Sequence, residues 1–326
     1  MIAPAQFERI LVTGSTGFVG RAVVRELLAR GIKPICLVRS VEKLLRQHPE
    51  VHPDRFTPIV GGLSDRGAVR EAAGMSQAAI HLVGIIIARP MRGQTFHRIH
   101  VEGTRRVIEA LQEAGVRRYL HMSALGTRSN AVSKYHRTKW EAEELVRQSG
   151  LEWTIFRPSL IHGPEGEFMR LMKRFMCSWL PPAIPYFGSG LAKVQPVSVK
   201  DVAYCFAQSL FSPETIGKIV PLCGPRPYTW IELYNACRAN MACAKRWKPL
   251  ISQPVAVAKA MAILGQPMMA LAEAIVPPLG LFRFDAGQVQ MSQEDNACDC
   301  TAAQNMFNIR MRDFETELSA YADLVS

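Results

Sequence analysis

The pattern of apolar positions changes abruptly near the start of the chain. Residues 10–13 form a short apolar run that predicts a buried strand. From Phe18 onward the apolar residues recur at helical spacing. Gly14, Gly17 and Gly20 lie three residues apart at this change of pattern. We therefore predict a strand that runs through a glycine turn directly into a helix.

Runs of strand length continue to alternate with helical patterns along the chain. Further strands are predicted over 34–39, 56–60, 78–84, 119–124, 153–159 and 218–223. Helices are predicted in the first part of 41–54 and over 66–73, 96–114, 135–147, 202–211 and 312–324. Asp65, Asp201 and Thr229 are the expected N-caps of three helices. This alternation is typical of parallel βαβ units, so we predict an α/β fold with a doubly wound parallel sheet.

The glycine turn suits a pyrophosphate group. Glycines let the backbone approach the ligand, and the free N–H groups that open the helix point at its negative charge. Gly20 is expected to allow close packing of the helix. A plain structural turn is the alternative, but a glycine triplet between a first strand and a first helix is the context that dinucleotide binding requires. The predicted contacts are Gly14, Ser15, Thr16, Gly17, Phe18 and Val19.

Arg39 and Ser40 end the second predicted strand, where this kind of fold meets the adenosine ribose. An acidic residue there binds the 2′-hydroxyl of NAD, whereas an arginine accommodates the 2′-phosphate of NADP. The acid is absent, so we predict NADP(H) in preference to NAD(H), with Arg39 covering the adenine as the alternative. Leu63 follows the third predicted strand, and Leu82, Val83 and Gly84 end the fourth. We expect all four residues to line the same crevice.

A serine, a tyrosine and a lysine follow in an order that indicates catalysis. Ser123 ends the fifth predicted strand, and Tyr135 and Lys139 share one face of the next helix. A nearby ammonium and a cationic nicotinamide would lower the pKa of the phenol. Ser123 would then polarise a substrate oxygen while Tyr135 moves its proton. The Tyr-x-x-x-Lys spacing also arises by chance, and His100 in the preceding helix is interpreted as a packed histidine.

These motifs resemble the short-chain dehydrogenase/reductase superfamily in its extended or atypical branch, whose members include NAD-dependent epimerase/dehydratase-like proteins. More narrowly, the chain is similar to bacterial relatives of the nucleotide-binding accessory subunit of mitochondrial complex I. The runs that carry this likeness are IHVEGT at 99–104, HMSALG at 121–126, YHRTK at 135–139 and WTIFRPS at 153–159. The resemblance covers nearly the whole chain, including the tail over 285–296.

The resemblance implies a Rossmann-type domain that binds NADP(H), with Ser123, Tyr135 and Lys139 at the triad positions and Pro158 in a loop that passes the nicotinamide. The expected division is an NAD(P)-binding core over 1–160 and a smaller, mostly helical C-terminal substrate lobe over 161–326. Part of that lobe, about 195–225, is expected to return to the core. Two positions depart from the family. Gly62 stands where an acidic residue often contacts adenine, and His100 stands where an asparagine often supports a proton relay.

The C-terminal half contains two apolar stretches of uncertain use. Residues 168–179 form a basic amphipathic pattern, for which core packing and a membrane-surface or hydrophobic-substrate role are the alternatives. Residues 255–282 are apolar and methionine-rich but are interrupted by charged residues and prolines. This interruption argues against a membrane span. We predict two short helices that form an apolar lobe suited to an isoprenoid or quinone-like molecule.

Composition narrows the class of partner. The formal net charge of the 326 residues is +11, and the sequence pI is about 9.5. This charge suits an anionic cofactor or an acidic membrane surface, whereas the basic residues are too dispersed to indicate nucleic acid. Eight scattered cysteines favour reduced core thiols and a cytoplasmic protein. No signal peptide is recognised, and Cys298 and Cys300 lack the further ligands of a metal site.

Two functions follow from these features. The first is an NADP(H)-dependent oxidoreductase, or a related epimerase or dehydratase, that acts on a carbonyl or alcohol of an apolar small molecule. The second is a non-enzymatic NADP(H)-binding subunit or redox sensor of a membrane redox complex, peripheral to the inner face of the membrane. Substrate identity and oligomeric state stay open at this point.

Overall fold

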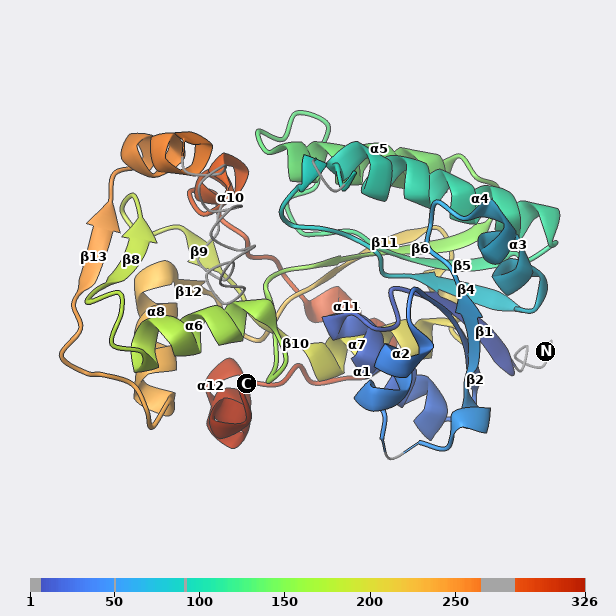
Figure 1. Cartoon of the computed structure of the whole chain (residues 1–326), viewed down its shortest axis with the longest axis horizontal. Coiled ribbons are helices and arrows are strands. Elements are labelled where there is room, and N and C mark those ends of the chain that lie inside the picture. The colour runs from blue at the N-terminus through green and yellow to red at the C-terminus, as the bar shows by residue number, and fades with distance from the viewer. Residues whose placement is uncertain (1–6, 50, 91–92, 265–284, 326) are drawn as a thin grey trace.

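The centre of the computed structural model is a seven-stranded parallel sheet (Figure 1). The structure describes residues 7–49, 51–90, 93–264 and 285–325. The strands are β1 (Arg9–Thr13), β2 (Lys33–Val38), β3 (Thr57–Val60), β4 (Ala78–His81), β5 (Arg118–Met122), β6 (Glu152–Pro158) and β11 (Lys218–Leu222). They lie in the order β11-β6-β5-β4-β1-β2-β3. The chain therefore reverses its direction of winding between β1 and β4, and the predicted doubly wound sheet is confirmed.

Helices cover both faces of this sheet (Figure 1). One face carries α1 (Phe18–Ala29), α2 (Val41–Gln47), α7 (Val199–Ser209) and α11 (Thr301–Phe307). The other carries α3 (Arg66–Gly74), α4 (Gly103–Glu113) and α5 (Lys134–Arg147). Ile10 and Val12 belong to the core on the first face, and Leu11 belongs to the core on the second. This alternation is the two-residue period of a strand that is buried on both sides.

Side-chain caps set the starts of several helices. Asp65 accepts a hydrogen bond from the Ala68 amide at 3.1 Å, and Thr229 forms a capping box with Glu232 at the start of α8 (Trp230–Asn240). Both caps were expected from the sequence. The prediction for Asp201 is wrong, because Ser198 caps α7 and places Asp201 inside the first helical turn. There its carboxylate pairs with Arg312 instead of capping the helix.

The C-terminal lobe has its own small core. It is built from α6 (Glu167–Cys177), α8, α12 (Phe314–Tyr321), the parallel pair β8 (Ile184–Phe187) and β13 (Leu250–Gln253), and the short pairs β7 (Ile161–His162) with β10 (Val197–Ser198) and β9 (Lys193–Val194) with β12 (Tyr228–Thr229). Met169, Met172 and Met176 of α6 are buried in this core. The apolar face of the amphipathic stretch is therefore used for packing. The stretch predicted as two helices is helical over 255–264, and the rest of it lies outside the described residues.

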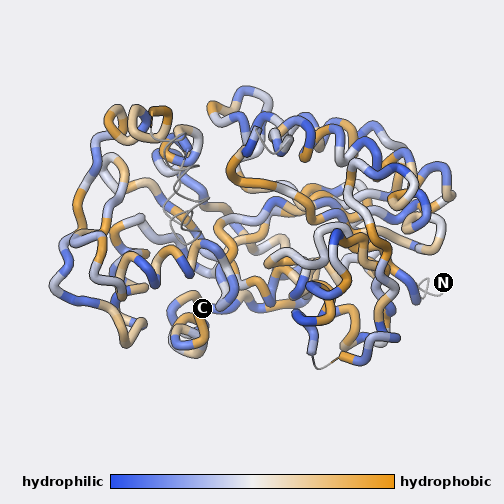
Figure 2. Tube along the Cα trace, viewed as in Figure 1, coloured by the Kyte–Doolittle hydropathy of each residue, from blue (hydrophilic) through white to orange (hydrophobic). Residues whose placement is uncertain are grey.

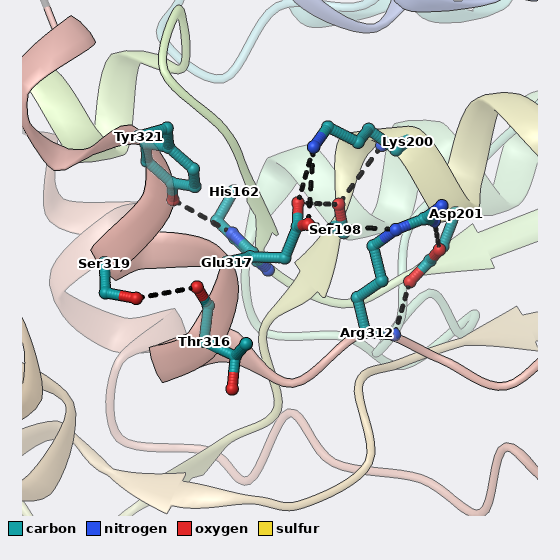
Figure 3. A network of polar contacts seen from close by, with 9 residues as sticks. All are labelled: His162, Ser198, Lys200, Asp201, Arg312, Thr316, Glu317, Ser319 and Tyr321. Atoms are coloured by element: carbon teal, nitrogen blue, oxygen red, sulfur yellow. Dashed lines mark hydrogen bonds and ion pairs between the residues drawn. The ribbon is translucent and has the colours of Figure 1, made fainter.

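A polar network fastens the C-terminal helix to the lobe and to α7 (Figure 3). Asp201 accepts a hydrogen bond from the Arg312 amide at 2.8 Å and also pairs with its guanidinium. Lys200 pairs with Glu317 at 3.2 Å. The Tyr321 hydroxyl lies 3.0 Å from Nδ1 of His162. Burial raises the pKa of Asp201, and the Arg312 contacts oppose that rise.

The oxidation state of the cysteines differs from the expectation of reduced thiols. Cys177 is bonded to Cys243, and Cys223 is bonded to Cys298, so four of the eight thiols are not reduced. The other four, Cys36, Cys205, Cys237 and Cys300, are free and buried. The bonded partners lie 66 and 75 residues apart in sequence, which is why spacing alone could not reveal them.

In the described part of the chain, no group of three or more His, Cys, Asp or Glu residues could hold a metal ion. None of the helices within the described ranges is both long and apolar enough to cross a bilayer.

Candidate cofactor and catalytic site

The glycine turn lies at the carboxyl end of β1, beside β4. Gly14 has a φ of +79°, a conformation that side-chain-bearing residues rarely adopt, and a Cβ there would meet Val83 Cγ2 at 3.2 Å. The Gly17 amide donates to the Gly14 carbonyl at 2.9 Å, and Gly17 is the N-cap of α1 without a side-chain cap. A Cβ at Gly20 would overlap the Gly14 carbonyl oxygen. The open N-terminus of α1 and this bare backbone fit a pyrophosphate.

The other turn residues take different places around this backbone. Ser15 and Val19 are buried, and Thr16 is half-buried with its carbonyl oxygen accepting from the Gln47 side chain at 3.3 Å. Phe18 is also half-buried, and its ring lies against Gly163 and Gly166, where a Cβ would come within 3.1 Å of the ring. The first turn of α1 is thus tied to the segment that enters the C-terminal lobe.

The residues at the ends of β2 and β3 form the second part of the site. Arg39 and Ser40 are exposed, and Ser40 uses its hydroxyl to cap α2 by accepting from the Lys43 amide at 3.1 Å. A Cβ on Gly62 would lie 3.9 Å from Arg39 Cγ, so the bare backbone at Gly62 faces the arginine stem. Leu63 is half-buried and fills the space beside Gly103. An arginine at this edge, with no acid beside it at Gly62, suits an anionic group on the ribose.

The residues after β4 connect the glycine turn to α5. The Leu82 amide donates to the Thr13 carbonyl at 3.1 Å, and the Val83 side chain packs against Gly14. Gly84 follows, and a Cβ there would lie 3.1 Å from Lys139 Nζ. This strand end therefore lies between Lys139 and the glycine turn.

Ser123 and Lys139 lie at the end of β5, and Tyr135 lies in the same helix as Lys139. Ser123 follows the last residue of β5 and is 3% exposed, with its hydroxyl 3.3 Å from that of Thr127. Lys139 Nζ donates to the Met122 carbonyl at 2.9 Å, which places the ammonium next to the residue before Ser123. Tyr135 stands one helical turn before Lys139, with its ring edge-on to His100 at 5.5 Å between centroids.

Backbone hydrogen bonds join the loop after β5 to the end of β6. The Ser123 amide donates to the Phe156 carbonyl at 2.7 Å, and the Leu125 amide donates to the Pro158 carbonyl at 2.8 Å. Pro158 itself is buried at the end of β6. These bonds fix the position of the Ser123 backbone beside β6.

The electrostatics of the tyrosine differ from the sequence expectation. Burial raises the pKa of Tyr135 to about 12, whereas the sequence predicted a lowering by the lysine. Burial lowers the pKa of Lys139 to about 8, and the Glu143 carboxylate one turn further along α5 opposes this shift. Glu143 is itself fully buried and bridges to Arg157 at 2.6 Å. In the protein alone, desolvation outweighs any influence of the ammonium on the phenol.

Comparison with known proteins identifies the family. A model of the NAD(P)H-binding family matches residues 14–175. The chain is 30% identical over 240 residues to a ceramide reductase of Caulobacter vibrioides, covering 73% of this chain and 72% of that protein. The chain belongs to the NAD(P)H-binding family. The resemblance stated from the sequence is thus confirmed, and this family member binds NAD(P).

Further comparisons agree with this family. The chain is 28% identical over 261 residues to a protein of Arabidopsis thaliana named NADH dehydrogenase (ubiquinone) 1 alpha subcomplex subunit 9, mitochondrial. That match covers 77% of this chain but 61% of the plant subunit. A UDP-glucose 4-epimerase from Thermotoga maritima superimposes with a TM-score of 0.72, at 17% identity and with 97% and 98% of the two chains covered. This last likeness shows the fold.

Three buried histidines in this family member were not recognised as a group from the sequence. His81 lies 2.6 Å from the Thr13 hydroxyl and 3.3 Å from that of Thr104. The ring of His121 stacks on that of His81 at 5.5 Å. Burial lowers the pKa of His81 to about 3 and that of His121 well below its ordinary value. His81 and His121 are neutral, because burial and the positive charge of Lys139 both disfavour protonation of their rings.

His100 is the third of these histidines and is packed and hydrogen-bonded as the sequence predicted. Its Nε2 accepts from the Ile85 amide at 3.1 Å, so the ring proton is on Nδ1, which lies 2.9 Å from the Thr138 hydroxyl. His100 is on a π-helical segment, His97–Glu102, that precedes α4 where the sequence predicted one continuous helix. Burial lowers the pKa of His100 to about 2. The residue holds the segment after Gly84 against α5.

Residues 285–296 also contact the site. Among the sequence observations, only the family resemblance had included this segment. α10 (Ala286–Met291) leads to Glu294, which pairs with Arg128 at 2.8 Å. The Ser159 hydroxyl donates to Asn296 Oδ1 at 2.6 Å, and Asn296 Nδ2 lies 3.4 Å from the Leu125 carbonyl. The loop between Ser123 and Tyr135 is therefore held by residues more than 150 positions away in the chain.

Proposed function

We propose that this protein is an NADP(H)-dependent oxidoreductase that transfers hydride to or from a carbonyl or alcohol carbon of an apolar small molecule. The observation that carries the proposal is the position of Lys139. Its ammonium lies on the Met122 carbonyl next to Ser123, against Gly84, and one turn after Tyr135. These are the residues that a carbonyl reduction needs beside a bound nicotinamide.

Each residue has a defined task in this proposal. The bound nicotinamide supplies or accepts the hydride. Ser123 donates a hydrogen bond to the substrate oxygen, and Tyr135 gives that oxygen a proton during reduction or takes it back during oxidation. Lys139 provides positive charge beside Tyr135 and hydrogen bonds for the ribose. His100 keeps Ile85 and Thr138 in place, which supports both the cofactor loop and the catalytic helix.

NADP(H) is proposed over NAD(H) because Arg39 is exposed at the end of β2 and no acid replaces it there. The apolar substrate is supported by the relative named ceramide reductase, which is similar over 72% of its length. A cytoplasmic location stays a prediction from the sequence, and the two disulfides remove its ground in reduced thiols. A related epimerase or dehydratase reaction uses the same hydride chemistry and is an alternative within the same site.

The first test is titration with NADPH and with NADH, followed by nicotinamide fluorescence. We expect tighter binding of NADPH, and Arg39→Asp should weaken NADPH binding by about 100-fold through loss of a charge-assisted contact and repulsion. Arg117→Asp, which makes the same charge change at the opposite end of the sheet, should leave binding unchanged. Equal binding of the two nucleotides to the wild type would contradict the preference. Failure of both to bind would overturn the proposal.

A second test addresses turnover with NADPH and apolar ketones. Tyr135→Phe should lose at least about 100-fold in kcat while keeping NADPH affinity, because only proton transfer is removed. Val132→Ala, at an exposed position in the loop before Tyr135, is the control. The alternative function is a non-enzymatic NADP(H)-binding subunit or redox sensor of a membrane redox complex, which the relative in mitochondrial NADH dehydrogenase supports. In that case Tyr135→Phe would leave the biological function unchanged.

A further inference from the structure

Two basic segments without a single carboxylate meet in the C-terminal lobe. Residues 168–187 contain three Lys or Arg, residues 233–264 contain five, and neither contains Asp or Glu. The structure joins them through the parallel pair β8 and β13 and through the Cys177–Cys243 bond. β8 and β13 lie at the end of the molecule farthest from the N-terminus (Figure 1). We call these two segments together the basic tip.

Large apolar side chains are exposed on the basic tip. Trp179 and Leu180 are each 73% exposed, and Trp247 is 57% exposed. The two indole rings lie beside one another with 6.3 Å between centroids, although they are far apart in sequence. Lys245 Nζ lies 3.7 Å above the Trp179 ring, and Arg246 is exposed next to Trp247. A cluster of exposed tryptophans indicates a surface that another apolar phase covers.

The loop that carries Trp247 is held firmly from beneath. The Lys245 amide donates to the Met176 carbonyl at 2.8 Å. Lys248 is 1% exposed and donates to the Phe175 carbonyl at 2.8 Å, while Arg238 donates to the Lys248 carbonyl at 3.0 Å. The exposed rings therefore project from an ordered platform at the end of α6.

The helix over 255–264 adds a second apolar surface to the basic tip. Its small residues Ala258 and Ala262 are buried, whereas Val257, Met261 and Leu264 are exposed. These three large residues are spaced four and three apart, so they share one helix face. Figure 2 shows this helix, at the upper left, as mostly hydrophobic. The helix thus exposes large apolar side chains and buries only alanines, whereas an ordinary surface helix buries its large apolar side chains.

We propose that the basic tip docks on the surface of an anionic lipid bilayer. Tryptophan prefers the membrane interface, and lysine and arginine are attracted to anionic headgroups. Both residue types are present, and no carboxylate in the basic tip opposes them. A protein partner is less suited, because an interface core is usually depleted of charge. This proposal goes beyond the proposed function and does not depend on catalysis by the protein. If the proposed function holds, docking would bring the protein to the membrane, which is a source of apolar substrates.

The test is sedimentation of the full-length protein with lipid vesicles. We expect binding to phosphatidylcholine vesicles that contain phosphatidylglycerol, weaker binding to phosphatidylcholine alone, and a shift of tryptophan fluorescence to shorter wavelength on binding. Trp179→Ala with Trp247→Ala, and separately Lys245→Glu with Arg246→Glu, should each weaken binding by about tenfold or more. Far-UV circular dichroism and thermal unfolding of each variant check that the protein is folded.

The matched control is Lys33→Glu with Lys218→Glu, which makes the same charge change at exposed positions of the seven-stranded sheet. It should retain vesicle binding. If the control weakens binding as much as the tip charge reversal, net charge alone is responsible and the proposal is overturned. Absence of vesicle binding by the wild type, or equal binding to neutral and anionic vesicles, would also overturn it. None of these outcomes bears on NADPH affinity, so the proposed function is judged separately.

Discussion

The candidate cofactor site buries polar side chains, whereas the basic tip exposes large apolar side chains. In the crevice, His81, His100 and Lys139 are almost completely buried, and each is hydrogen-bonded. At the basic tip, Trp179 and Trp247 are exposed although burial would stabilise the fold. Burial of polar groups and exposure of large apolar groups both reduce stability when nothing compensates.

The difference shows how the two regions meet their partners. A cofactor site must be preorganised before its ligand binds, and His81, His100 and Lys139 are held by threonine hydroxyls and by backbone atoms. The basic tip keeps its apolar groups for a partner outside the chain. Variants that exchange these properties should therefore affect different measurements: nucleotide affinity and stability for the crevice, and vesicle binding for the tip.

The largest effect is expected from Gly20→Val. The new side chain would overlap the Gly14 carbonyl and the Ser15 backbone, so α1 must move away from the glycine turn. We expect NADPH affinity to fall by more than about 100-fold and stability to fall by about 3 kcal/mol. Gly74→Ala is the control, because a Cβ there meets no atom. It should bind normally; similar losses in both variants would show that the overlap is not the cause.

Stability alone should separate the sheet from the tip. Ile80→Ala in β4 removes a fully buried side chain and should lower the free energy of unfolding by about 3 kcal/mol. Leu180→Ala, at a 73% exposed position, should change it by less than about 0.5 kcal/mol. Urea denaturation measures both. A large loss for Leu180→Ala would mean that the tip is covered within the chain itself.

Arg312→Ala should weaken the attachment of the C-terminal helix. The change leaves the carboxylate of Asp201, which is 1% exposed, without its cationic partner. Because the Arg312 side chain is partly exposed, we expect a loss of about 2 kcal/mol rather than the full effect of a buried pair. Arg310→Ala, at an exposed position two residues earlier, is the comparison and should be nearly neutral. Equal melting temperatures for the two variants would contradict this role.

The smallest effect concerns pH. The folded-state pKa of His100 is lowered from 6.5 to about 2, so its contribution to stability is fully present above pH 6.5 and is lost as the pH falls toward that value. Between pH 6.5 and 5.5 this amounts to about 1 kcal/mol. His100→Asn should remove that part of the pH dependence in urea denaturation. An unchanged slope would show that other groups, such as His81, account for it.

The predictions from sequence were most accurate where the signal was local. The glycine turn, the strands and the caps at Asp65 and Thr229 depend on neighbouring residues, and they appear in the structure as expected. The roles of Ser123, Tyr135, Lys139, Arg39, Leu63 and the other proposed contacts stay predictions, although the structure places Lys139 beside Gly84 and Met122. The cap at Asp201 failed because a long-range partner, Arg312, competes for its carboxylate.

The amino-acid sequence by itself determined the order of strands and helices, the glycine turn and the spacing of Tyr135 and Lys139, because these follow from periodicity and local geometry. Only the tertiary structure decided which distant groups meet: Asn296 with Ser159, Cys177 with Cys243, and Trp179 with Trp247. It also decided that burial raises the pKa of Tyr135. Desolvation and long-range contacts depend on how the whole chain packs, which no short stretch of sequence contains.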